Sequence, residues 1–197
     1  MRRGRPRLSQ HFCNRHEAQV RAFGMKHVLE VPADALVVLV GVVGSGKTTF
    51  AARHFAPTEV LSSDAFRAMV ADDPADQRAT DEAFRLLHTA LEMRLQRRRL
   101  TVVDATNVEA WARGQLLDVA WRCRRPAVAM VLDLPLETCL RRNATRTDPH
   151  PPAAAIRRQH RLLHDTLAAM SAEGFAAVHH LGGPDEVDAV RIERVAR

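Results

Sequence analysis

The sequence predicts an α/β protein whose central parallel sheet carries helices on both faces. Short apolar runs alternate with amphipathic segments along the chain, without an internal repeat or a low-complexity block. This alternation is typical of parallel strands joined by helical crossovers. One apolar run, residues 36–40, enters a glycine-rich loop that leads directly into a helical segment, and two later runs lead into Asp64 and Asp104. We therefore expect a polar site at the carboxyl edge of the sheet.

Length and composition indicate a single domain of ordinary size, with or without a tail. The chain has 197 residues, 46% of them hydrophobic, and no apolar run approaches the ~20 residues of a membrane span. Three scattered cysteines, Cys13, Cys123 and Cys139, indicate reduced thiols in a cytoplasmic protein, not a disulfide framework or a zinc site. Aromatic residues make up only 5%, with no tyrosine, which argues against a base-stacking nucleic-acid platform.

The positive charge is concentrated at the N-terminus. Of the formal net charge of +6, residues 1–24 supply +5, because they hold six arginines and one acidic residue, Glu17. We expect residues 1–24 to form a basic, disordered tail, with a nucleic-acid-binding arm as the alternative, and residues 25–197 to form the folded domain. The domain itself is nearly neutral, so it must use individually placed arginines.

The first strand–helix unit follows from local patterns. A continuous apolar run predicts a buried strand over 36–40. A helix over 47–54 ends before an Ala-Pro pair, because the residue preceding a proline disfavours the helical conformation. A second short apolar run predicts a strand over 58–61. Ser62–Asp64 then supplies the hydroxyl and carboxylate groups that begin a helix continuing through 66–70.

The middle of the chain predicts two helices around a buried strand. After an acidic turn at 72–76, residues 77–97 form an amphipathic helix. Its apolar face is expected to consist of Phe84, Leu87, His88, Leu91 and Leu95. Residues 100–104 form a buried strand that ends in an acid. The helix over 108–122 is expected to turn Trp111, Leu116 and Val119 inward.

The C-terminal part continues the alternation. An apolar run predicts a strand over 127–132, closed by a proline three residues later. Two helices are expected over 137–146 and 154–172, separated by the polar, proline-rich loop 147–152. Short apolar segments then predict two strands, over 176–179 and 187–190.

The glycine-rich loop predicts a nucleoside triphosphate site. Gly41, Gly46, Lys47 and Thr48 fit the G-x-x-x-x-G-K-[ST] pattern between a strand and a helix. Glycines let successive backbone N–H groups surround phosphate oxygens, and the helix N-terminus favours the same anion. Lys47 is expected to contact the β- and γ-phosphates and Thr48 to bind Mg²⁺. The expected ATP- and phosphate-binding residues are Gly41, Gly44, Ser45, Gly46, Lys47, Thr48 and Thr49.

Three further groups of polar residues stand where phosphoryl transfer would need them, although each also has a structural interpretation. Asp64 and Arg67 share one helical turn and suit either a phosphoryl acceptor or a simple cap with its salt bridge. Asp104 suits either a Walker-B-type acid that holds Mg²⁺ through water or a helix cap. Arg142 and Arg146, four residues apart on one expected helix face, suit either a lid over the triphosphate or a solvated surface.

The order of several segments resembles a known enzyme family. The segments are Val38–Gly46, Thr58–Asp64, Asp72–Gln77, Leu100–Val108 and Arg142–Asp148. Together they resemble the 5′-kinase module of bacterial polynucleotide kinase–phosphatases, which are RNA end-healing enzymes. The likeness runs from about Met25 to the C-terminus, and the first 24 residues have no counterpart in the family.

The resemblance implies a P-loop kinase fold with an arginine-bearing lid and ATP-dependent phosphorylation of the 5′-hydroxyl end of RNA or DNA in repair. It implies that Lys47, Asp64, Arg142 and Arg146 are catalytic, with Asp64 as general base and the two arginines in the lid. It also implies that Arg67 clamps the adjacent 3′-phosphate of the acceptor. Gln77 lies in a matching acceptor-side segment.

Two features depart from the family pattern. Such modules commonly head a larger protein with phosphatase and ligase domains, whereas this chain stops after the kinase, and the sequence leaves open whether phosphatase and ligase partners exist as separate chains. The lid loop reads Pro-His-Pro-Pro over 149–152, where the family pattern suggests a basic residue near position 149. This difference concerns the grip of the lid and not the reaction.

Other functions remain open from the sequence. The nearest alternative is a P-loop kinase of a small molecule, in the style of zeta-toxin or antibiotic phosphotransferases; Arg67 and residues 72–77 favour the polynucleotide. A nucleotide-dependent switch or motor ATPase is disfavoured, because there is no N-K-x-D tetrapeptide and Asp104 is followed by alanine, not glutamate. A nucleic-acid-binding protein that relies on its basic arm is disfavoured by the nearly neutral remainder of the chain.

Overall fold

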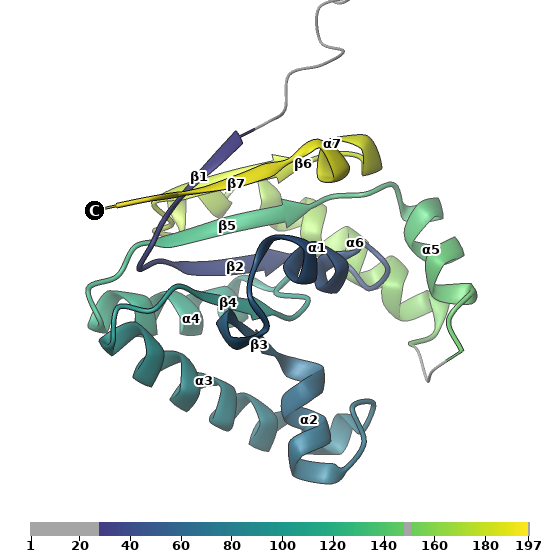
Figure 1. The fold of residues 1–197 in the computed structure, drawn as a ribbon. Coiled ribbons are helices and arrows are strands. Elements are labelled where there is room, and N and C mark those ends of the chain that lie inside the picture. Colours follow the sequence, from purple (N-terminus) through teal and green to yellow (C-terminus); the bar gives the residue numbers. More distant parts are fainter. Residues whose placement is uncertain (1–27, 148–150, 197) are drawn as a thin grey trace, which may run out of the picture.

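A five-stranded, all-parallel sheet forms the centre of the molecule (Figure 1). The structure is a computed structural model that describes residues 28–147 and 151–196. The strand order is β3-β4-β2-β5-β6. The strands are β2 (Leu36–Val40), β3 (Val60–Ser62), β4 (Thr101–Asp104), β5 (Ala127–Leu132) and β6 (Ala177–Leu181). Every residue of β2, β4 and β5 is buried, which is typical of parallel strands covered on both faces.

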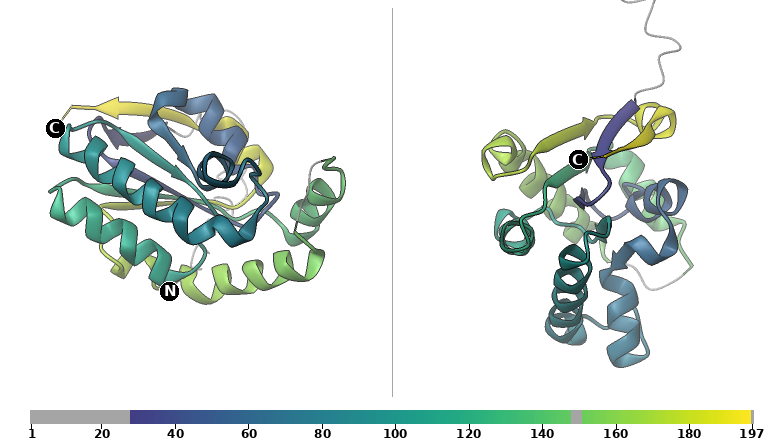
Figure 2. Two further views of the ribbon diagram at one scale, coloured as in Figure 1. Left: turned by 90° about the horizontal axis from the view of Figure 1, so that it is seen from below. Right: turned by 60° about the vertical axis from the view of Figure 1, so that its left-hand side comes forward.

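Helices cover the two faces as right-handed crossovers require. α1 (Lys47–His54) lies on one face, and α4 (Ala110–Arg122) and α6 (Ala153–Leu167) lie on the other (Figure 2, left). α3 (Thr80–Gln96) packs beside α4 and contacts the β3–β4 edge, and α2 (Ser63–Ala71) packs on α3. The expected α/β fold with helices on both faces is therefore confirmed. The apolar face expected for α3 is also present, with Leu87, Leu91 and Leu95 fully buried.

A second, two-stranded sheet was not predicted from the sequence. β1 (Val28–Pro32) pairs in parallel with β7 (Arg191–Val195), the last strand of the chain. Both strands are partly exposed and carry charged residues, so neither shows the continuous apolar run that marks the central strands.

The strand expected over 187–190 is wrong. Residues Pro184–Ala189 form the short helix α7, and β7 begins only at Arg191. Pro184 at the first helical position, followed by Asp185 and Glu186, is a helix-start signal. Val187 and Val190 are three residues apart, a spacing that suits one face of a helix but places the two side chains on opposite faces of a strand.

Several predicted boundaries shift because short 3₁₀ turns replace the ends of longer elements. Residues Pro57–Glu59 form such a turn before β3, and Gln77–Ala79 form one before α3. α5 (Leu136–Ala144) ends two residues before the predicted limit, and α6 gives way to a 3₁₀ turn at Met170–Ala172. The order of these elements nonetheless agrees with the prediction.

Trp111 does not point inward as predicted. Its side chain is 65% exposed, whereas Leu116 and Val119 of the same helix are buried as expected. At 3.6 residues per turn, Trp111 lies about 140° around the helix from Leu116, so the two cannot share a face.

Two expectations fall on parts of the chain for which the structure gives no description. The basic tail predicted for residues 1–24 and the predicted domain start at residue 25 both lie outside the described residues. Within the described ranges, no helix is long and apolar enough to cross a membrane.

Candidate active site

The glycine-rich loop between β2 and α1 has a backbone that side chains would disrupt. Gly44 and Gly46 adopt positive φ angles of 84° and 95°, which residues with a Cβ rarely adopt. A Cβ on Gly44 would lie 2.5 Å from the carbonyl oxygen of Cys139 in α5, so the loop also packs closely against that helix. Gly46 is the N-cap of α1 and directs the loop into the helix N-terminus. The loop therefore has the form that anion binding requires.

Lys47 lies folded back beneath this loop. Its Nζ donates hydrogen bonds to the carbonyl oxygens of Gly41 (2.8 Å) and Val42 (2.9 Å). Burial lowers the pKa of Lys47 to about 8, against the opposing influence of Asp104. A buried ammonium at the first residue of α1 is well suited to a phosphate, whose charge would offset the cost of desolvation.

Thr48 and Asp104 come together at the edge of the sheet. β2 and β4 are neighbours in the sheet, with Leu39 opposite Asp104, so the end of β4 lies next to the start of the loop. The Thr48 side chain lies close enough to the Asp104 carboxylate to influence its pKa. Burial raises the pKa of Asp104, and the contact with Thr48 opposes this. A hydroxyl beside a carboxylate is an all-oxygen donor set of the kind Mg²⁺ prefers, so these two residues fit the expected metal role.

Asp64 and Arg67 form an ion pair on the first turns of α2, next to the loop. The cap of α2 is Ser62 and not Asp64, which leaves the Asp64 carboxylate 61% exposed toward solvent. Arg67 is only 10% exposed, and its Nε donates to the carbonyl oxygen of Pro74 at 2.9 Å. The salt bridge expected from the simpler interpretation is thus present, but the capping role is not.

Gln77 also faces the same region. Its side chain donates a hydrogen bond of 3.3 Å to the carbonyl oxygen of Ala75, and both residues line the cleft described below.

Arg142 and Arg146 reach the loop from the opposite side, although not as predicted. Arg142 belongs to α5 and its Nη1 lies 3.5 Å from the carbonyl oxygen of Gly44. Arg146 follows the end of α5, in a turn where its N–H donates to the carbonyl oxygen of Asn143. The expectation of one shared helix face is therefore wrong, because α5 ends at Ala144 and the chain then turns.

Two residues of α6 that the sequence did not single out also face the site. Arg158 lines the cleft. The Oε1 atom of Gln159 accepts a hydrogen bond of 3.1 Å from the backbone N–H of Val43, within the glycine-rich loop. The contact spans 116 residues of sequence, so no local pattern could have indicated it.

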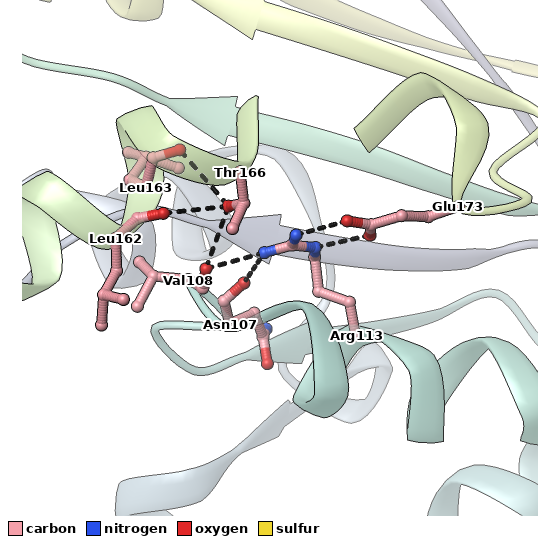
Figure 3. Close-up of polar contacts among 7 residues, drawn as sticks. All are labelled: Asn107, Val108, Arg113, Leu162, Leu163, Thr166 and Glu173. Atoms are coloured by element: carbon pink, nitrogen blue, oxygen red, sulfur yellow. Dashed lines mark hydrogen bonds and ion pairs between the residues drawn. The ribbon is translucent and has the colours of Figure 1, made fainter. Parts of the chain in front are cut away.

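A buried arginine fixes the segment that follows Asp104 (Figure 3). Arg113 of α4 is fully buried and its Nη1 donates to the carbonyl oxygens of Asn107 (3.0 Å) and Val108 (2.9 Å). The rest of its guanidinium forms a two-point ion pair with Glu173, at 2.7 and 2.5 Å. The adjacent Thr106 carbonyl accepts a hydrogen bond from the N–H of Gly41. Arg113 thereby supports the contact between this segment and the start of the loop.

A single cleft of about 1110 Å³ unites these groups. With the exception of Gly41, every residue expected at the site lines it. Those residues are Gly44, Ser45, Gly46, Lys47, Thr48, Thr49, Asp64, Arg67, Gln77, Asp104, Arg142 and Arg146. The expected lid residues Pro149 and His150 lie outside the described part of the chain.

Comparison with known proteins places the chain in a family. A model of the AAA domain matches residues 36–168, which run from the strand before the glycine-rich loop to the end of α6. The chain belongs to this AAA-domain family. No curated protein sequence is significantly similar to it.

Solved structures similar to this AAA domain include a chain of an RNA repair complex and several kinases. A chain of the Pnkp1/Rnl/Hen1 RNA repair complex is 25% identical, with a TM-score of 0.57 over 72% of the present chain. The present chain spans only 47% of that relative. APS kinase CysC of Mycobacterium tuberculosis (20% identity, TM-score 0.50) and a gluconokinase of Sinorhizobium meliloti (19%, 0.50) each match over 81% of this chain. The match covers 95% of the former and 90% of the latter, and at this identity it concerns the fold alone.

Proposed function

We propose that the protein is an ATP-dependent polynucleotide 5′-hydroxyl kinase, which transfers the γ-phosphate of ATP to the 5′-OH end of RNA or DNA in end repair. The observation that carries this proposal is the Asp64–Arg67 pair on α2, which opens into the same cleft as the glycine-rich loop. One carboxylate and one cation on the acceptor side are what a hydroxyl next to a phosphodiester requires.

The donor side of the cleft would hold ATP through the loop and α1. The loop amides and Lys47 would bind the β- and γ-phosphates, and Thr48, with Asp104 acting through water, would hold Mg²⁺. Bound Mg²⁺ would neutralise negative charge on the phosphates while the γ-phosphoryl group passes from ADP to the acceptor oxygen. Lys47 would then leave the carbonyl oxygens of Gly41 and Val42, to which it now donates.

On the acceptor side, Asp64 would act as general base. Its exposed carboxylate lies close enough to Lys47 and Asp104 to influence the pKa of both. The acceptor oxygen would lose its proton to Asp64 as it forms the bond to phosphorus, and ADP would leave. Arg67 would bind the phosphate that follows the 5′ nucleoside. Among the described residues it uses two of its five N–H groups, on Asp64 and Pro74, so others are available to an anion.

Arg142 and Arg146 would act as lid residues over the transferring phosphoryl group. Both line the cleft opposite α2, and Arg146 is close enough to Lys47 to lower its pKa. Positive charge placed there would favour the transition state, in which negative charge spreads over the phosphoryl oxygens.

The similarity to a chain of the Pnkp1/Rnl/Hen1 RNA repair complex supports a repair role. By this analogy, the protein would act together with partner proteins of an RNA repair complex. The alternative is a kinase of a small molecule, since APS kinase and the gluconokinase share the fold. The acceptor-side arginine separates the two proposals, because a small uncharged acceptor offers it no phosphate.

A cycle of two proteins and two acceptors tests the proposal. Wild type and Arg67→Ala are assayed on a nucleoside 3′-monophosphate and on the bare nucleoside. Wild type should prefer the phosphorylated acceptor by roughly tenfold or more, since a charge-assisted contact contributes roughly 1.5–3 kcal/mol, and the variant should lose that preference.

Arg85→Ala is the matched control, because Arg85 lies on α3 in an exposed pair with Glu82 and does not line the cleft. Equally fast transfer by wild type to the bare nucleoside and to its 3′-monophosphate, or a preference that survives in Arg67→Ala, would favour the small-molecule kinase.

A further inference from the structure

Three histidines surround one aspartate behind the glycine-rich loop, at the carboxyl end of β5. Asp133 follows β5 directly, His160 and His164 lie on α6, and His180 lies on β6. His160 and His164 are one helical turn apart, so their rings face the same direction. We propose that Asp133, His160 and His164 bind a divalent transition-metal ion such as Zn²⁺, at a site separate from the Mg²⁺ site.

Two of the three distances between the ligand atoms match those around such an ion. One ligand atom from each of the three residues lies within 4.8 Å of the other two. The Nε2 atoms of His160 and His164 are 3.3 Å apart, and His164 Nε2 is 3.2 Å from Asp133 Oδ1. A tetrahedral zinc ion with ligands at about 2.0–2.1 Å places neighbouring ligands about 3.3 Å apart. Two facing ring nitrogens and a carboxylate oxygen therefore need little movement to bind the ion.

His180 acts on the other oxygen of the same carboxylate. Its Nε2 lies 2.9 Å from Asp133 Oδ2, and the Asp133 side chain is only 10% exposed. A metal-binding carboxylate is commonly held by such a second hydrogen bond, which fixes its orientation. His180 is therefore a positioning residue for Asp133. His164, at 47% exposure, leaves a path for an ion to enter.

The ligand types distinguish this ion from the one expected beside the phosphates. Imidazole nitrogen suits Zn²⁺, Cu²⁺ and Ni²⁺, whereas Mg²⁺ requires oxygen ligands. The Thr48–Asp104 pair offers oxygen alone, and the Asp133 cluster offers two nitrogens and one oxygen. The two sites would therefore take different ions from a mixture.

Metal binding here would fasten α6 to the sheet next to the phosphate loop. The ligand His160 is adjacent to Gln159, which holds the Val43 N–H. The ligand Asp133 follows β5, whose last residue, Leu132, lies beside Gly41. A bridge between α6 and β5 would therefore stabilise the folded protein and the position of Gln159.

The test is zinc binding by the full, untagged chain after treatment with a chelator. Competition with a chromophoric chelator measures affinity and stoichiometry, and thermal unfolding is recorded with and without Zn²⁺. Wild type should bind one equivalent and unfold at a higher temperature when loaded. His160→Ala and His164→Ala should each lose more than tenfold in affinity together with the thermal shift, and His180→Ala should lose about 10–100-fold.

The matched control is Asp165→Asn, which removes an exposed carboxylate next to His164 on α6. This variant should bind zinc as wild type does, and circular dichroism of every variant without metal verifies the fold. The proposal is overturned if wild type binds no zinc, which would leave a hydrogen-bonded cluster only. It is equally overturned if the histidine variants bind as tightly as wild type, which would place the zinc elsewhere, for example on His11, Cys13 or His16.

Discussion

The burial of the charged Lys47 side chain in the glycine-rich loop is energetically unfavourable in the ligand-free protein. Its pKa in the folded protein, about 8, lies below the ordinary value of 10.5. Protonated Lys47 therefore destabilises the ligand-free protein at pH values below about 8. This penalty disappears as the pH rises toward 10.5, because the unfolded chain then binds more protons at this residue than the folded one.

Lys47→Met should consequently unfold at a higher temperature than wild type at pH 7 in the absence of ATP. The gain should be at most about 3 kcal/mol, from 1.36 kcal/mol per unit of pKa, and should shrink between pH 8 and pH 10. Thermal unfolding of both proteins across this range measures the difference, because the groups that also titrate there, the three cysteines and Lys26, are present in both. A difference in stability that does not change with pH would contradict the buried, charged Lys47.

At the scale of single residues, the sequence was most informative where chemistry restricts residue type. The pattern from Gly41 to Thr48 could be recognised because its backbone favours glycine and because the proposed phosphate and Mg²⁺ contacts require a lysine and a hydroxyl. Gln159 and Arg113 could not be recognised, because each acts on backbone atoms that the fold brings close. The His-x₃-His spacing of His160 and His164 was a visible signal, but its partner Asp133 comes from another element.

At the scale of elements, α5 and the turn after it place two arginines at the cleft, one from a helix and one from a turn. Arg142 is fixed in a helix, whereas Arg146 follows the helix end. Arg142→Ala and Arg146→Ala should each lower kcat by about 10²–10³ and change the KM for ATP much less, because the proposed contacts form mainly in the transition state.

Steady-state kinetics with varied ATP provides the test of these two arginines. Arg141→Ala is the control, since Arg141 is an exposed neighbour on α5 that does not line the cleft. If both cleft variants raise only the KM for ATP, the arginines bind ATP in its ground state and do not act as lid residues.

The segment after β4 depends on the buried pair of Arg113 and Glu173. Arg113 is fully buried, and Glu173→Gln would leave its charge without a full counter-charge. We expect the variant to lose about 3–5 kcal/mol of unfolding free energy, as is usual when one partner of a buried pair is removed.

Denaturant unfolding measures this loss, with Asp188→Asn as the control. Asp188 pairs with Arg53 at the surface, where both side chains are about half exposed or more, so its loss should cost at most about 1 kcal/mol. Equal losses of unfolding free energy in the two variants would contradict a larger contribution from the buried Arg113–Glu173 pair than from the exposed Arg53–Asp188 pair.

Predictions at the element scale succeeded for elements with a strong apolar pattern and failed at their ends. The predicted bounds of β2, α1 and β5 agree with the structure, because buried parallel strands and the helix after the loop have unambiguous sequence patterns. β1 and α7 were missed because both are partly exposed and short. The end of α5 was misplaced because it depends on a turn between Asn143 and Arg146 that propensity alone does not specify.

At the scale of the whole molecule, strand order accounts for the site. β2 lies between β4 and β5, so the loop after β2 meets Asp104 on one side and the residues after β5 on the other. α2 then brings Asp64 and Arg67 to the cleft, and α5 with the turn after it brings Arg142 and Arg146. The order of strands could not be read from the sequence alone, but the rule that ligands bind at the carboxyl ends of parallel strands predicted where these groups would meet.

Label transfer from γ-labelled ATP tests the central proposal most directly. Matched RNA and DNA oligonucleotides are supplied with a 5′-hydroxyl or with a 5′-phosphate, alongside a bare nucleoside, and Lys47→Met serves as the inactive control. The account predicts Mg²⁺-dependent label on the 5′-hydroxyl oligonucleotides, none on those already phosphorylated, and none with Lys47→Met. Labelling of the nucleoside alone, or ATP hydrolysis without label on any oligonucleotide, would contradict a polynucleotide 5′-hydroxyl kinase.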